Sequence, residues 1–571
     1  NKELTELCTI LGLDKKIALE AYFGGAPLSD VEEVKMREKM RYGRVVVMAD
    51  QDLDGSHIKG LVMNFFDCIF PTLLRDDTFF ASFRTPIIRA TPPRRSGSGS
   101  GGKTKTKKKK KKEDMLSFYS LRDYETWRSE LIAAEHASSA VELSDSAATV
   151  RAMKGWGVKY YKGLGTSSSA EAREYFGDLD KHLVPLTWAA DGEDNAERLS
   201  LAFSKDRAAD RREWLLGADL AGDATAIDVN DTSLSYVDFV DKELVHFSHA
   251  DSVRSIPSMV DGLKPSQRKV LFACLKRNLT REIKVAQLAG YVAEHTAYHH
   301  GEVSLHSTIV NMAQDFVGAN NLPLLKPSGQ FGTRLQGGKD AASSRYIFTH
   351  LDPIVPLLFK PDDDPVLAFG EDDGMSIEPE WYMPVIPFAL VNGCDGIGTG
   401  WSTSVPSHHP LDVAQNVRRH IEGEAMEEMT PWVRGFKGVI EPLLIEGGGA
   451  GGAIAKFTSI GDVETVPKQK NSIRVTELPV RRWTETYKEW LSEQLQLGVV
   501  KDFRENHSEV DVDFTVHLTP AGLDTLLKTG AGRSKKAKGA AGKTAKKKSG
   551  RPTKEEKRVN VIKALRLEST I

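Results

Sequence analysis

Cysteine is scarce in this sequence, and its apolar residues never form a long run. The four cysteines among 571 residues are widely scattered and form no CxxC pair, which supports neither a zinc site nor a disulfide framework and favours a reducing compartment. No segment approaches the roughly 18 unbroken apolar residues of a membrane span. Hydrophobic residues at 40% and charged residues at 27% predict a globular protein of several domains, because the chain is too long for one ordinary core.

Two stretches contain no acidic residue at all. Residues 94–112 carry ten basic groups and residues 533–551 carry nine, out of 77 basic residues in the chain. The rest of the sequence therefore has 58 basic against 79 acidic residues, a net charge of −21. Both stretches lack anything to bury, which predicts disordered insertions that bind nucleic acid or act as nuclear-import signals. A solvated linker is the alternative.

The segment VVVMADQDLDGSHIKG, residues 45–60, places three carboxylates at alternate positions after four apolar residues. Val45–Met48 predicts a short buried strand, since a β-branched run suits a sheet that is covered on both faces. Asp50, Asp52 and Asp54 follow at the strand end, where like charges repel one another unless a cation neutralises them. Hard oxygen ligands of this kind favour Mg²⁺, which takes one or two protein carboxylates. The alternative is a solvated acidic turn.

The first part of the chain, to about residue 90, alternates strand and helix patterns, with a helix pattern over 56–70. A strand, a turn and then a helix predict a doubly wound α/β unit, whose ligands lie at the carboxyl ends of its strands. Globular composition resumes after the first basic run, which is therefore expected to be an insertion inside one domain.

The pattern changes near residue 235. Helical periods broken at Pro257 and at Gly262–Pro265 predict a helix–turn–helix. Arg268 and Lys269 lie early in its second helix, where such folds contact DNA, although exposed basic residues at a helix start are also common. From about 386 to 530 the sequence has mainly strand patterns with glycine turns.

Several long motifs agree with one family, in that family's order. They are YKGLGTSS (161–168), DGLKPSQRKVLF (261–272), YHHGEVSL (298–305), NNLPLLKPSGQFGTRLQGGKDAASSRYIFTHLDP (320–353) and EPEWYMPVIPFALVNGCDGIGTGWST (378–403). Together with ADQDLDGSHIKGL, which is similar to a TOPRIM metal motif, they resemble eukaryotic-type DNA topoisomerase II. The acidic motif and the tyrosine of SSRYIFT share one polypeptide, as in the eukaryotic form.

The resemblance implies a covalent mechanism. Through it, Tyr346 is expected to attack the DNA phosphorus and form a 5′-phosphotyrosyl bond, which preserves the energy of the phosphodiester for religation. Arg345 and Arg268 would supply positive charge to the phosphoryl oxygens. His300 would bond to the scissile phosphate or help to move the tyrosyl proton.

The resemblance also implies a metal and a DNA-binding surface. Mg²⁺ held by Asp50 and Asp52, with Asp54 completing the motif, would activate or stabilise the 3′ oxygen. Ile397 of GCDGIGTGW would wedge between base pairs and bend the DNA, whereas the alternative is a tight turn whose isoleucine packs inward. The other DNA contacts implied are Lys59, Lys162, Lys264, Gln267, Lys269 and Lys339.

The implied fold class is α/β and α+β, in several domains. These are a doubly wound TOPRIM domain over 1–215 that contains the insertion 94–112, a winged-helix domain over 235–385 that carries the tyrosine, and a β-rich tower domain over 386–571 that contains the run 533–551. The family's first-strand EGDS stretch, its ATPase domain and its C-terminal dimer gate have no counterpart here, so a fragment is expected. The implied partners are double-stranded DNA and a second copy of the chain, without a membrane. The implied cofactors are Mg²⁺ and ATP, with the ATP site on the absent domain, and the location is nuclear.

Two other classes of function remain open. A TOPRIM nuclease or primase would use only the aspartate motif and would form no tyrosyl adduct. A non-catalytic chromatin scaffold would hold DNA through the winged helix and the basic runs, and it would not need Tyr346.

Overall fold

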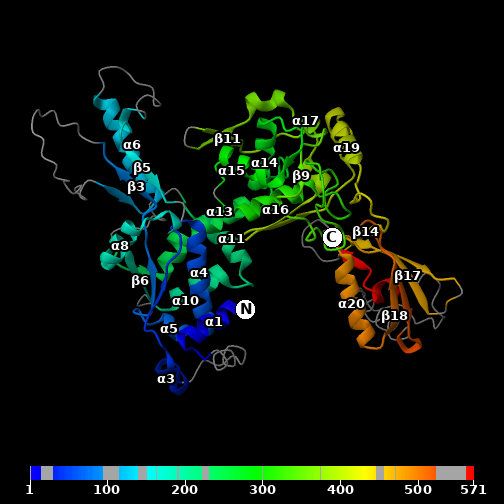
Figure 1. Cartoon of the computed structure of the whole chain (residues 1–571), viewed down its shortest axis with the longest axis horizontal. Helices are drawn as coiled ribbons and strands as arrows, with labels where there is room; N and C mark the ends of the chain where they lie inside the picture. The colour runs from blue at the N-terminus through cyan, green and yellow to red at the C-terminus, as the bar shows by residue number, and fades with distance from the viewer. Residues whose placement is uncertain are drawn as a thin grey trace, which may run out of the picture. The chain divides into compact units, whose positions relative to one another are not determined.

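The computed structural model describes residues 2–14, 30–93, 115–138, 149, 151–161, 164–188, 192–220, 231–298, 300–372, 375–444, 455–467, 469, 471–522 and 561–571. They divide into two compact units (Figure 1). The first unit comprises Asn1–Ser252 with Gly398–Trp401, and the second comprises Val253–Ile397 with Ser402–Ile571. The two basic runs, 94–112 and 533–551, lie outside the described residues. The three-domain division stays a prediction.

The first unit is a mixed α/β structure. Its elements are α1 (Lys2–Leu11), α3 (Asp30–Lys39), β1 (Val45–Val47), α4 (Leu53–Ile69), α5 (Pro71–Leu74), β2 (Phe80–Phe83), β3 (Ile88–Thr91), β4 (Leu116–Phe118), α6 (Leu121–Ser138), β5 (Gly157–Tyr160), the 3₁₀ turn η2 (Leu164–Thr166), α8 (Ser169–Gly177), α9 (Leu179–His182), β6 (Leu183–Thr187), α10 (Gly192–Phe203), α11 (Ala208–Gly217), β7 (Leu234–Ser235), α12 (Tyr236–Asp238), the π-helix η4 (Phe239–Leu244) and α13 (Val245–Ser255), which reaches into the second unit.

A four-stranded sheet in the order β1-β2-β6-β7 lies at the centre of this unit. Its pairs β1–β2 and β6–β7 are parallel, whereas β2–β6 is antiparallel, so the sheet is mixed rather than wholly parallel. The predicted helix is confirmed as α4, whose Phe66 packs edge-on against Phe80 of β2 with ring centroids 6.1 Å apart. A second sheet, β4-β3-β5, is antiparallel.

The strand predicted after residue 44 is present as β1, but its predicted burial on both faces is wrong. Val45 and Val47 pack against the core of the unit, while Val46 between them is 42% exposed and Met48 is 43% exposed. Successive side chains of a strand point to opposite faces, so the sheet is covered here on one face only. Within the described residues β1 is also an edge strand.

The second unit contains further helices and several small sheets. Its elements are α14 (Pro265–Lys276), β8 (Ile283–Lys284), α15 (Val285–His295), α16 (Glu302–Ala313), β9 (Phe348–Thr349), α17 (Val355–Leu358), the 3₁₀ helix η5 (Pro361–Val366), β10 (Phe369–Asp372), β11 (Met375–Pro379), α18 (Phe388–Asn392), β12 (Cys394–Ile397), β13 (Ser402–Val405), α19 (Pro410–Glu422), β14 (Val439–Leu444), β15 (Ala455–Ile460), β16 (Asp462–Thr465), β17 (Ser472–Glu477), α20 (Thr484–Gln496), β18 (Val500–Glu505), β19 (Phe514–Leu518) and β20 (Glu568–Thr570).

Two separate hydrophobic cores hold this unit together. The first runs from Leu263 to Val413 and packs α14, α15 and α16 together. The second packs α20 against the antiparallel sheet β16-β17-β19-β18, seen in the orange part of Figure 1. Phe388 and Val391 belong to the first core, so that core continues beyond the boundary predicted at 386.

The helix break predicted at Pro257 and Gly262–Pro265 is confirmed, since it separates α13 from α14, and Pro265 occupies the first turn of α14. Along the described residues, no helix is both long and apolar enough to cross a membrane.

Candidate functional site

Asp50 and Asp52 lie at the junction between β1 and α4. Asp52 caps the helix: its Oδ1 accepts a hydrogen bond of 2.7 Å from the backbone N–H of Gly55. The Oδ1 of Asp50 accepts a hydrogen bond of 2.7 Å from the backbone N–H of Leu164, from a loop distant in sequence. Only glycine fits at position 55, because a Cβ there would lie 1.8 Å from the carbonyl oxygen of Asp50.

The predicted cluster of three carboxylates is not formed. Among the described residues, no group of three or more His, Cys, Asp or Glu side chains could hold a metal ion. Asp52 instead satisfies the helix start and Asp54 lies within the first turn of α4, where the partial positive charge of a helix N-terminus stabilises carboxylates. The helix terminus thus supplies part of the neutralising charge that the run of three aspartates requires. The pair Asp50 and Asp52 stays a predicted metal site.

The pair fits Mg²⁺ by its donors. In the hydrogen bonds of the described residues, each of the two carboxylates engages one oxygen and leaves the other available. Mg²⁺ keeps several waters and takes one or two protein carboxylates, so two oxygens at one strand end suffice.

Lys59, a predicted DNA contact, lies inside the first unit. Its side chain is 4% exposed and its ammonium pairs with the carboxylate of Glu243 on η4, which also accepts a hydrogen bond of 2.6 Å from Ser56. The buried face of α4 explains this position, because Ser56, Lys59 and Met63 recur at helical spacing. Direct contact with DNA is therefore not available to Lys59 in this structure. Lys162 lies outside the described residues.

Tyr346 lies in an exposed turn of the second unit. Its side chain is 72% exposed, and its backbone N–H donates a hydrogen bond of 2.9 Å to the carbonyl of Ser343. The neighbouring Ile347 is 1% exposed and belongs to the first core of the unit. The carbonyl of Ile347 accepts from the N–H of Val285 at 3.0 Å, which ties the turn to the start of α15. The phenol is thus presented to solvent by a backbone held firmly from below.

Arg345 and His300 are also exposed. The guanidinium carbon of Arg345 lies 5.9 Å from the ring centroid of Tyr346, at the outer limit of a cation–π contact. His300 packs edge-on against Tyr298, with ring centroids 5.4 Å apart. Both side chains belong to the second unit, as Tyr346 does, whereas the carboxylate pair belongs to the first.

Arg268, predicted to supply charge to the phosphate, is buried. Its Nε and one terminal nitrogen donate to the two carboxylate oxygens of Asp261 at 2.7 and 3.0 Å. Asp261 is fully buried and also accepts from the backbone N–H of Tyr382 at 3.0 Å. Because both donors of the fork are engaged inside the protein, Arg268 is placed to stabilise the entry to α14 rather than to contact a phosphate. The predicted direct contact does not fit this position.

Three other predicted DNA contacts cluster at α14 and have protein partners. Lys264 is its N-cap, and its backbone N–H donates to Gln267 at 2.9 Å. Lys269 donates to the carbonyl of Thr296 at 2.6 Å and pairs with Glu378 at 2.7 Å. Lys264 and Gln267 are half-buried, so these residues have structural roles whether or not they bind DNA.

The other two predicted contacts are exposed. Lys339 lies in an open turn before Asp340. Ile397 ends β12, pairs with Ser402 of β13 and is 82% exposed, so its side chain does not pack inward as the alternative required.

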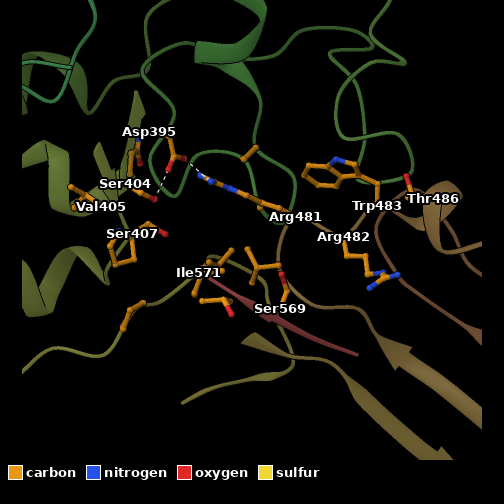
Figure 2. A pocket seen from close by; sticks show the side chains of 18 residues that line it. Asp395, Ser404, Val405, Ser407, Arg481, Arg482, Trp483, Thr486, Ser569 and Ile571 are labelled. Carbon is orange, nitrogen blue, oxygen red and sulfur yellow. Dashed lines mark hydrogen bonds and ion pairs between the residues drawn. The ribbon is translucent and has the colours of Figure 1, made fainter. Parts of the chain in front are cut away.

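A pocket of about 420 Å³ lies beside the same hairpin in the second unit (Figure 2). Figure 2 shows Arg481 reaching across it to Asp395 of β12, with a distance of 2.6 Å between Arg481 and the carboxylate. Ser404 of β13 donates to the other oxygen of Asp395 at 2.7 Å. Burial lowers the pKa of the neighbouring Arg482. Sequence reasoning missed Arg481, because nothing in LPVRRWT points to a partner so distant in the chain.

The comparisons with known proteins agree over most of the sequence. Residues 254–530 match the family model of DNA gyrase/topoisomerase IV, and residues 83–252 match that of the C-terminal associated domain of TOPRIM. The mitochondrial DNA topoisomerase 2 of Dictyostelium discoideum is 45% identical over 92% of this chain and 36% of its own length. Human DNA topoisomerase 2-alpha is 43% identical over 93% of this chain and 31% of its own length.

A solved structure gives the same result. The DNA-binding, cleavage and re-ligation domain of Plasmodium falciparum topoisomerase II has a TM-score of 0.62 and 37% identity, over 100% of this chain and 65% of that one. The chain spans about a third of the length of the curated relatives it matches.

Proposed function

This chain belongs to the type II DNA topoisomerase family, and we propose that it forms the DNA cleavage and religation core of such an enzyme. In this function the protein cuts both strands of a duplex, holds the ends covalently while another duplex passes, and reseals them. The observation that carries the proposal is the exposed phenol of Tyr346, beside Arg345, on a turn fixed by the buried Ile347.

The chemistry requires a nucleophile that conserves the phosphodiester energy, and the phenol of Tyr346 is such a nucleophile. Arg345 stabilises the negative charge that gathers on the phosphoryl oxygens, because its guanidinium is exposed on the same turn. His300, which is exposed as well, takes up the tyrosyl proton or bonds to the phosphate. Arg268 acts indirectly, through its buried pair with Asp261.

Asp50 and Asp52 would hold Mg²⁺. When bound, the ion would stabilise charge on the 3′ oxygen. The protein's own contribution is to fix the two carboxylates, one through the helix cap and one through the N–H of Leu164.

The proposed partners are double-stranded DNA and a second copy of the chain, because two strands must be cut by two tyrosines. Ile397 serves as a wedge that bends the duplex, and Lys339 contacts its backbone. ATP would act in the whole protein, since neither 45–60 nor 393–401 has phosphate-loop spacing. The proposed location is the nucleus.

The test is covalent trapping with the full-length gene product that carries these residues. Wild type is incubated with duplex DNA and Mg²⁺, denatured with detergent, and assayed for protein-linked DNA. The variant Tyr346→Phe is expected to form no adduct while binding DNA as wild type does. Tyr42→Phe, which alters a tyrosine that is 55% exposed in the first unit, is the control and should form adduct normally.

The other outcomes separate the rival functions. Adduct in Tyr346→Phe would assign the nucleophile to another residue. Cutting without any adduct in wild type would identify a TOPRIM nuclease, and binding without cutting would identify a scaffold.

A further inference from the structure

Glu171 lies at the start of α8, and one carboxylate there binds both ends of a loop. Its Oε1 accepts a hydrogen bond of 2.5 Å from the hydroxyl of Tyr161. Its Oε2 accepts from the backbone N–H and the hydroxyl of Ser168, at 2.7 and 2.9 Å. The side chain is 15% exposed. The loop between Tyr161 and Ser168 is therefore closed by a single side chain.

Basic side chains hold this carboxylate in place. Lys159 of β5 lies 3.0 and 2.8 Å from the two oxygens and lies over the ring of Tyr161, 4.4 Å from its centroid. Arg89 of β3 lies 3.7 Å away. Burial alone would raise the pKa of Glu171, but the hydrogen bonds from Lys159, Tyr161 and Ser168 outweigh it and lower the pKa to about 2. The group is accordingly an anion at any ordinary pH.

The loop that Glu171 closes carries Leu164, whose N–H donates to Asp50. That bond fixes one of the two carboxylates of the β1–α4 junction, and it comes from a backbone atom, so its position depends on the path of the loop. Closing a loop at both ends reduces the conformations open to the residues between them.

We propose that Glu171 is a positioning residue for the metal site: it clamps the loop 161–168 so that the N–H of Leu164 orients Asp50 for Mg²⁺. The proposal rests on the function proposed above for Asp50. It assigns to Glu171 a role beyond capping α8, because the same carboxylate binds Tyr161 at the far end of the loop. Partners that orient a metal ligand commonly contribute about 10–100-fold in metal affinity.

The test compares Glu171→Gln with Glu174→Gln in the full-length gene product. Glu174 lies on the same helix and pairs at 3.3 Å with Arg89 of β3, which is outside the loop, so it controls for a lost charge on α8. The first measurement is the Mg²⁺ concentration that gives half-maximal DNA cleavage. We expect it to rise about 10-fold in Glu171→Gln, with the maximum recovered at high Mg²⁺, and to stay unchanged in Glu174→Gln.

The second measurement does not depend on activity. Hydrogen exchange of the peptide covering 161–168 should speed up in Glu171→Gln without metal or DNA, while the exchange of the core helix α4 stays as in wild type. Tyr161→Phe removes one end of the clamp with little loss of volume and should give a smaller change in the same direction. This milder variant keeps the test sharp if Glu171→Gln fails to fold.

The outcomes divide clearly. Faster exchange of the loop together with an unchanged Mg²⁺ requirement would overturn the positioning role and leave Glu171 as a structural clamp. Unchanged exchange would overturn the clamp itself. If wild type forms no tyrosyl adduct, the proposed function has failed instead, and the exchange result still decides whether the clamp exists.

Discussion

Arg268 and Asp261 form a buried ion pair in which the guanidinium donates to both carboxylate oxygens. The pair joins the first turn of α14 to the segment before it, and through the N–H of Tyr382 it also joins the chain that leads to α18. Removing one partner of a buried pair is far more costly than losing a surface contact, because the other charge is left unpaired. Arg268 and Arg345 therefore differ in kind, although both were predicted to contact DNA.

We expect Arg268→Ala to lower the free energy of unfolding by about 3–5 kcal/mol. Arg345→Ala should leave it within about 0.5 kcal/mol, since the side chain is exposed. The order reverses for DNA cleavage, where Arg345→Ala should lose about 10²–10³ in rate with little change in DNA affinity. Denaturant unfolding and timed adduct trapping measure the two effects.

Asp261→Asn is the matched control for this first prediction. It keeps the shape of the side chain and breaks the same pair, so it should destabilise the protein as Arg268→Ala does. A stable Arg268→Ala protein that cleaves slowly would show instead that this arginine leaves its buried position to act on the phosphate.

The sequence predicted the elements around the site better than the direction of its cations. The strand, the helix α4 and the break before α14 were predicted correctly, because apolar periodicity and proline act locally. Lys59 and Arg268 were assigned to DNA from their motifs alone. Their spacing placed them with the apolar residues of their helices, so this part of the error was visible in the sequence: Lys59 lies one turn from Met63, and Arg268 lies one turn from Leu271.

Other parts of the site depend on contacts that no local pattern encodes. The S-x-x-E spacing of Ser168 and Glu171 is a recognisable capping box, yet the bond from Tyr161 to the same carboxylate depends on how β5 returns to α8. The contact between Leu164 and Asp50 joins segments 114 residues apart. Arg481 has a backbone φ of 63°, in the left-handed region, which its sequence does not announce.

Lys59 and Lys339 provide a second comparison, of a buried and an exposed lysine. Lys59→Met should destabilise the protein by about 3–5 kcal/mol, because Glu243 loses its partner in a nearly dry site. It should not change the salt dependence of DNA binding. Lys339→Met should leave stability unchanged and reduce the slope of log affinity against log salt by about 0.9 if this lysine contacts one phosphate. Fluorescence anisotropy at several salt concentrations measures the slope. A reduced slope in a folded Lys59→Met protein would contradict the buried position.

The exposed tip of β12 gives a third prediction. Ile397→Ala should reduce the bend of bound duplex DNA, measured by energy transfer between dyes at its ends, because the apolar wedge that unstacks a base step is lost. DNA affinity should fall only modestly, since phosphate contacts remain. Ile421→Ala, on α19 and 76% exposed, is the control and should leave the bend unchanged. An equal bend in wild type and Ile397→Ala would assign the bending to other residues.

The clamp formed by Glu171 predicts a particular pH dependence of stability. The pKa of this carboxyl is lowered from its ordinary value of 4.5 to about 2 by the hydrogen bonds from Lys159, Tyr161 and Ser168, which outweigh burial. A group whose pKa is depressed on folding stabilises the protein above its unfolded pKa and loses that contribution as the pH falls through its folded pKa. The difference in unfolding free energy between wild type and Glu171→Gln should therefore be constant above pH 4.5 and shrink steadily between pH 4.5 and about 2. In Tyr161→Phe the lost hydrogen bond raises the folded pKa, so the contribution of Glu171 should be smaller and should disappear at a higher pH. Denaturant unfolding of the three proteins from neutral pH downward measures these differences, and a difference that grows as the pH falls would show that Glu171 is protonated in the folded state.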